Sequence, residues 1–186
     1  MSLFFRLLWT MMFSRFRKPC DFLGPCRTGF RVWPTDLDGL GHVNNGRYLT
    51  ILDLARVDLM IRSRMLGKVQ AKKWYPIVIG QGIEFKKSLR VFERFEVETT
   101  LLGWDEKTIF LEQKFLTWGA RVVGDRAAAP TTVAACALIR ARFLKKSGGS
   151  VSSEELLKVV SNPPPVGHLP QWVRDWDQAQ SILRKG

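Results

Sequence analysis

The chain has 186 residues, 46% of them hydrophobic, so it can bury the core of a single domain and is not an intrinsically disordered protein. Its 29 Lys and Arg against 17 Asp and Glu give a formal net charge of +12, which favours anionic lipid or polyanionic partners. No RNA-binding signature accompanies the charge, so nucleic acid is not expected as a partner. Three cysteines, an odd number, argue against a disulfide framework, and two histidines are too few for a structural zinc site, so no metal is expected.

Residues 1–18 form a basic, apolar segment that we separate from the domain. They carry four positive charges and no acid, and their longest apolar run is far shorter than the ~20 residues that a membrane-spanning helix needs. Such a segment suits a membrane interface, with its basic side chains among the headgroups, which predicts a membrane-associated protein on the cytoplasmic side. Two alternatives stay open: an organellar targeting peptide, which would make the protein mitochondrial, and a terminal helix that packs on the domain.

The first half of the domain, which we expect to span 19–146, contains one strand and one long helix. A β-prone run at 28–33 is stopped by Pro34. After a polar loop, residues 46–66 show helical periodicity and are apolar around most of the circumference. A helix of this kind has to be wrapped by other structure.

Strand patterns dominate the second half of the domain. They occur at 75–90, 95–104, 107–118 and 131–144, with GWDEK as a hairpin turn between the second and the third. The last three can pair antiparallel. We therefore predict an α+β fold in which a five-stranded sheet curls around one helix, because the helix needs covering and the sheet needs one apolar face filled.

A helical extension is predicted at 147–186. Ser152 and Glu155 are spaced as a capping box for a short helix, three prolines at 163–165 form a stiff linker, and Pro170 starts a last helix. We expect one face of this last helix to pack on the domain or on a neighbour; its residues are Trp172, Trp176, Ala179 and Leu183.

Polar residues capable of chemistry gather just before the long helix, in the run TDLDGLGHVNNGRY at 35–48. The amino end of a helix exposes unpaired N–H groups and a partial positive charge, which polarise a carbonyl oxygen. A carboxylate a few residues earlier can reach that carbonyl or a water beside it. Asp38 is the candidate, with a turn-and-cap role as its alternative; for Asp36 the loop-capping role is the better interpretation.

The run at 31–56 resembles the signature of hot-dog thioesterases of the 4-hydroxybenzoyl-CoA thioesterase type. The runs PCDF at 19–22, KSL at 87–89 and LLGWDEKTIFLEQKF at 101–115 are similar to the subgroup that includes thioesterase superfamily member six and its bacterial relatives. The resemblance covers 19–143. It implies a hot-dog fold, and a homodimer whose sheets join edge to edge with each active site at the subunit boundary.

The resemblance also implies roles for individual residues. Asp38 would be the nucleophile or general base that hydrolyses an acyl-CoA or acyl-ACP thioester, and the backbone N–H of Asn45 would polarise the thioester carbonyl. His42, Asn44 and Tyr48 would contact substrate, with helix capping as the alternative role of Asn44. No cofactor is expected beyond the CoA of the substrate. The competing hypothesis is a catalytically idle hot-dog subunit that serves as a scaffold in a larger membrane or organellar complex.

Overall fold

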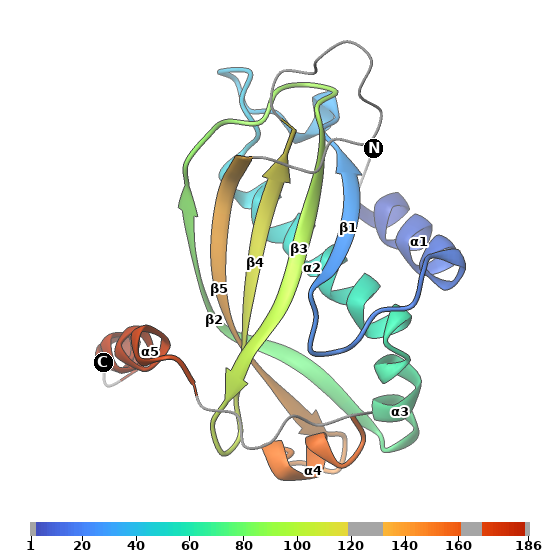
Figure 1. The fold of residues 1–186 in the computed structure, drawn as a ribbon, viewed down its shortest axis with the longest axis vertical. Helices are drawn as coiled ribbons and strands as arrows, with labels where there is room; N and C mark the ends of the chain where they lie inside the picture. The colour runs from blue at the N-terminus through green and yellow to red at the C-terminus, as the bar shows by residue number, and fades with distance from the viewer. Residues whose placement is uncertain (1–2, 119–131, 161–168, 185–186) are drawn as a thin grey trace.

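The computed structural model describes residues 3–118, 132–160 and 169–184 (Figure 1). In chain order the elements are α1 (Leu3–Phe13), β1 (Cys26–Arg31), α2 (Asn45–Arg62), α3 (Met65–Ala71), β2 (Trp74–Phe85), β3 (Arg94–Trp104), β4 (Ile109–Thr117), β5 (Thr132–Lys145), α4 (Ser153–Leu157) and α5 (Gln171–Arg184). Two short 3-10 turns, Ser14–Phe16 and Pro34–Asp36, follow α1 and β1. Among these described helices, none combines the length and the apolar character needed to cross a membrane.

The five strands form one sheet in the order β1-β3-β4-β5-β2, and each neighbouring pair is antiparallel. Helix α2 lies against one face of this sheet (Figure 1). The predicted α+β fold, a five-stranded antiparallel sheet packed on one central helix, is confirmed. β2 follows the helices in sequence but lies at the sheet edge beyond β5, where Tyr75 and Val78 remain exposed.

The long helix is shorter than predicted. It stops at Arg62, and the chain turns at Ser63 and Arg64, whose φ of 60° is left-handed, before α3 begins. Apolar residues on both sides of this turn keep a helical spacing, so the pattern extended through Leu66 and hid the break.

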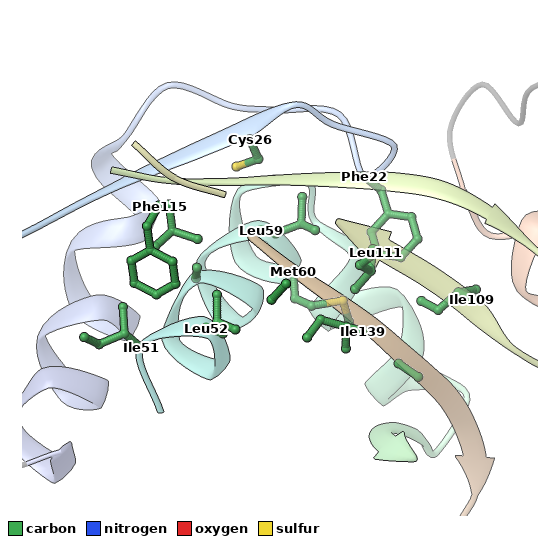
Figure 2. Packing of buried hydrophobic residues seen from close by; sticks show 14 of the residues in the cluster. Phe22, Cys26, Ile51, Leu52, Leu59, Met60, Ile109, Leu111, Phe115 and Ile139 are labelled. Atoms are coloured by element: carbon green, nitrogen blue, oxygen red, sulfur yellow. The ribbon is translucent and has the colours of Figure 1, made fainter. Parts of the chain in front are cut away.

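One apolar core lies between α2 and the sheet (Figure 2). Ile51, Leu52 and Leu59 of the helix belong to the same cluster as Leu111, Phe115 and Ile139 of the strands. Leu52, Phe115 and Ile139 are fully buried. Each such side chain contributes about 1.5–3 kcal/mol through loss of contact with water, which makes this core the main source of stability.

Helix α5 covers part of the opposite face of the sheet. Phe110 and Leu138 alternate with residues of the main core, so they point to the other face, where they form a second cluster with Val173 of α5. Beside it, the Arg140 guanidinium lies 2.7 Å from the Asp177 carboxylate, with 4% of Arg140 exposed.

The face of α5 that packs on the domain differs in part from the face predicted to pack on the domain or on a neighbour. Trp176 does pack on the domain, with its indole over Gly82, but Trp172 is 51% exposed and Ala179 is also exposed. The sheet presents an apolar patch next to the buried Arg140. Val173 of α5 packs on the patch, and Asp177 pairs with the arginine. The side chain of Leu183 lies outside the described residues.

The capping box at the start of α4 is confirmed. The Glu155 N–H donates to Ser152 Oγ at 3.1 Å, and the Ser152 N–H donates to Glu155 Oε2 at 3.0 Å. α4 packs into the main core through Leu156. The proline linker predicted at 163–165 lies outside the described residues.

Candidate functional site

The loop that leads into α2 folds back on itself as a small hairpin. Leu37 and Val43 form an antiparallel bridge, and the Asp38 N–H donates to the His42 carbonyl at 2.8 Å. Gly41 turns the chain with a φ of +77°, which is left-handed backbone that glycine adopts without strain. The hairpin places Asp38 and His42 opposite each other on the surface, immediately before the helix.

Asp38 uses one carboxylate oxygen to hold this loop and leaves the other one open. Its Oδ1 accepts the N–H of Leu40 at 2.9 Å and the N–H of His42 at 3.2 Å. Its Oδ2 accepts no hydrogen bond from the residues that the structure describes, and the side chain is exposed. The turn-capping role is therefore real, and it is compatible with a reactive second oxygen.

The amino end of α2 has the features expected of a carbonyl-polarising site. Asn44 is the N-cap, and its Oδ1 accepts the Gly46 N–H at 2.9 Å, so the capping alternative for Asn44 is what the structure displays. The N–H of Asn45, the first helical residue, meets no acceptor in the described part of the chain and is exposed. That N–H carries the partial positive charge of the helix end and is free to bind an oxygen.

Tyr48 lies deeper than the other candidates. Only 3% of it is exposed, and its ring makes edge-on contacts with Phe85 and Phe115, each with centroids 4.9 Å apart. Burial raises the pKa of its hydroxyl, and the nearby backbone of Leu89 opposes this effect. Tyr48 thus ties α2 to the sheet directly beneath the loop.

Asp36 has the structural role that the sequence favoured. It is 2% exposed, its Oδ2 accepts the Trp33 N–H at 2.9 Å, and the same oxygen pairs with Arg6 of α1 at 2.5 Å. The partner from α1 was not predicted, because 30 residues separate the two side chains in sequence.

A cavity of about 350 Å³ runs along the second half of α2, and no pattern in the sequence marked its place or its lining residues. Its walls are almost entirely apolar and come mainly from α2, β2, β4 and β5; they include Val57, Met60, Ile77, Leu111, Ala141 and Phe143. Asp53 and Arg56 are the charged residues that line it, whereas Asp38 does not. A sheet wrapped round a helix can leave such a space wherever side chains are short, and this cannot be seen in a hydrophobic pattern.

Arg56 connects this cavity to a buried polar chain. Its guanidinium donates to Gln113 Oε1 at 2.5 Å and pairs with Asp53, and burial lowers its pKa. Gln113 is fully buried and donates to the Leu52 carbonyl at 3.2 Å and to Thr99 Oγ1 at 3.0 Å. In the described residues, no group of three His, Cys, Asp or Glu side chains is arranged to hold a metal ion.

The fold has many solved counterparts. The YbaW probable thioesterase from Escherichia coli superimposes with a TM-score of 0.61 at 24% identity, over 71% of this chain and 93% of that one. A 4-hydroxybenzoyl CoA thioesterase crystallised with 4-hydroxybenzoyl CoA gives a TM-score of 0.60 at 14% identity, over 73% of this chain and 98% of that one. At these identities the structures establish the hot-dog fold.

Sequence comparison establishes the family. Protein THEM6 of Xenopus laevis is 30% identical over 153 residues, which are 82% of this chain and 69% of that protein. Protein THEM6 of Danio rerio is 28% identical over 182 residues, 97% of this chain and 85% of that protein. The family model described as the thioesterase-like superfamily matches residues 32–176, from the loop with Asp38 to α5. The chain therefore belongs to the thioesterase-like superfamily of hot-dog proteins.

Proposed function

We propose that this protein hydrolyses acyl thioesters of CoA or of acyl carrier protein, with Asp38 as the reacting carboxylate. The observation that carries the proposal is the open Oδ2 of Asp38, on a loop that runs into a helix whose first N–H, that of Asn45, is unpaired within the described residues. Membership of the thioesterase-like superfamily and the CoA thioesterases among the structural counterparts support the substrate class.

The chemistry needs two groups acting on one carbonyl. The Asn45 N–H donates to the thioester oxygen and stabilises the negative charge that develops there. Asp38 either attacks the carbonyl carbon, forming an anhydride that water then opens, or removes a proton from the water that attacks. In both cases the C–S bond breaks, its electron pair leaves on sulfur, and CoA departs as the thiol after it gains a proton.

The apolar cavity beside α2 is the proposed site for the acyl chain. Pro76, Ile77 and Val78 of the edge strand β2 form one of its walls, and Val78 is 39% exposed. An exposed edge strand invites pairing with a second strand, so we propose that two copies join along β2 as a homodimer. The partner would then cover the open side of the cavity and complete a site that one chain leaves exposed.

The test compares two carboxylates in the same assay. Purified protein is given acyl-CoAs of increasing chain length, and the released thiol is measured for wild type, Asp38→Asn and Asp53→Asn. We expect Asp38→Asn to lower kcat/KM by ~10²–10⁴, the usual contribution of a positioned acid or base. Asp53→Asn should keep kcat and change KM for long chains only, because Asp53 borders the cavity. Loss of turnover in Asp53→Asn with full activity in Asp38→Asn would refute the assignment.

A second candidate is the idle scaffold subunit, and one observation favours it: Asp38 holds its own turn and does not line the cavity. This candidate requires that wild type hydrolyse none of the acyl thioesters. It also requires that the protein leave cell extracts as a stable part of a larger complex.

A further inference from the structure

Helix α1 is mounted on the domain with its polar side inward. Arg6, Thr10 and Ser14, which follow one another at helical spacing from α1 into the adjoining turn, are 7%, 4% and 1% exposed. A surface helix normally buries its apolar residues and exposes its polar ones. Here the reverse holds. The outward residues, which we call the apolar outer face, are Phe4 (64% exposed), Phe5 (62%), Leu8 (48%), Trp9 (54%), Met11 (43%), Met12 (54%) and, just beyond the helix, Phe16 (83%).

Two buried carboxylates hold α1 in this orientation. Asp36 pairs with Arg6, as described above. Asp58 of α2 is fully buried, and its oxygens accept from Ser14 Oγ at 2.5 Å and Arg17 Nη1 at 3.2 Å. Rotation of α1 to hide its apolar residues would leave the buried Asp36 without its cationic partner and would take Ser14 away from Asp58, so it is unfavourable. The outward position of the apolar outer face is therefore a stable feature of the fold.

The neighbouring surface is cationic. A cavity of about 480 Å³ opens between α1 and the β1–β3 edge; four arginines and a single acid, Glu96, are among its lining residues, together with Trp9, Trp33 and Trp118. Arg31 and Arg94, both exposed lining residues, are direct partners across the β1–β3 ladder. Like charges opposite each other destabilise a sheet unless an anion lies between them. Arg15 and Lys18, just beyond α1, are exposed as well.

We propose that α1 docks this protein on the surface of an anionic phospholipid bilayer. The apolar outer face enters the boundary between headgroups and acyl chains, and a lipid phosphate binds between Arg31 and Arg94. A large exposed apolar patch beside basic residues is the arrangement that binds anionic membranes. At 11 residues, α1 is about 16 Å long and lies in the interface without crossing it. A second copy of the chain at this face would bring arginines against arginines, so the local charge favours the lipid.

The test is flotation of the full chain with vesicles of phosphatidylcholine, alone or mixed with phosphatidylserine. Wild type should float with the mixed vesicles, and added salt should weaken the binding. Phe5→Gln/Met12→Gln should lower the partition coefficient at least tenfold. The control Trp172→Gln/Ile182→Gln removes two large apolar side chains of similar exposure from α5 and should bind as wild type does.

A second pair of variants tests the anion. Arg31→Gln/Arg94→Gln should remove the preference for phosphatidylserine, whereas Lys146→Gln/Lys158→Gln, which loses the same charge at a distant exposed site, should keep it. Circular dichroism and thermal melting verify that every variant is folded.

Four results would overturn the proposal. First, wild type does not float with the mixed vesicles; second, the α1 and α5 variants float equally. Third, free CoA displaces the protein from vesicles, which would assign the arginines to substrate. Fourth, the α1 variant changes only self-association, measured by light scattering. Hydrolysis of a soluble short-chain acyl-CoA without vesicles is measured separately, so failure here leaves the proposed activity standing.

Discussion

Three aspartates near α2 show how position decides what one side chain does. Asp38 is exposed with one oxygen open, Asp36 caps a turn and pairs with Arg6, and Asp58 is fully buried with four donors around it. Those donors are Ser14, Arg17, Thr28 and Arg62. A buried carboxylate that is satisfied in this way fixes its neighbours, because any loss leaves cations and hydroxyls unpaired.

Removal of the Asp58 carboxylate should be costly. We expect Asp58→Ala to lower the free energy of unfolding by ~3–5 kcal/mol, the range for breaking a buried charge pair, and to release α1. Asp53→Ala on the same helix should lower it clearly less, because Asp53 is 64% exposed and Arg56 keeps its hydrogen bond to Gln113. Urea unfolding curves measure both, and equal effects would show that the Asp58 network does not stabilise the fold.

At the scale of elements, α2 and α5 lie on opposite faces of the sheet and are held there by different contacts. α2 is held by a broad apolar core, whereas α5 depends on Val173, Trp176 and the Arg140–Asp177 ion pair. A small contact area can be released without loss of the main fold, since local openings cost less than global unfolding.

Adjacent residues of α5 should therefore behave differently. Val173→Asp puts a charge at a fully buried position and should detach the helix, so that its amide protons exchange faster while those of β4 and β5 stay protected. Trp172→Asp, one residue earlier and half exposed, should leave exchange unchanged. Hydrogen exchange with mass spectrometry distinguishes the two. Rapid exchange in the Trp172 variant alone would mean that α5 packs through the face expected from its sequence.

For the whole molecule, the outstanding feature is the free edge at β2. The other edge strand, β1, lies next to α1, whereas β2 presents Val78 and Tyr75 to solvent. Natural proteins protect such an edge or use it to associate. Edge-to-edge pairing at β2 leaves α1 accessible, so a dimer could present two membrane-docking helices.

The proposed dimer predicts a particle of twice 21.3 kDa in light scattering. Val78→Lys, on the edge, should shift the equilibrium toward monomer at least tenfold, because a charge on an edge strand opposes pairing. Val91→Lys is the control, since Val91 is exposed to a similar extent, 42% against 39%, but lies outside the strands. A wild type that is monomeric at all concentrations would contradict the proposed dimer.

The sequence by itself determined the element order, the wrapped helix, the antiparallel sheet and the loop that carries Asp38. These follow from local periodicity and turn chemistry, which neighbouring residues encode. Only the tertiary structure decided the break after Arg62, the packed face of α5, the cavity beside Asp53 and the inward polar side of α1. Each of these depends on partners far along the chain, such as Arg6 with Asp36 or Ser14 with Asp58, and a buried charge 44 residues away can reverse the face that a helix buries.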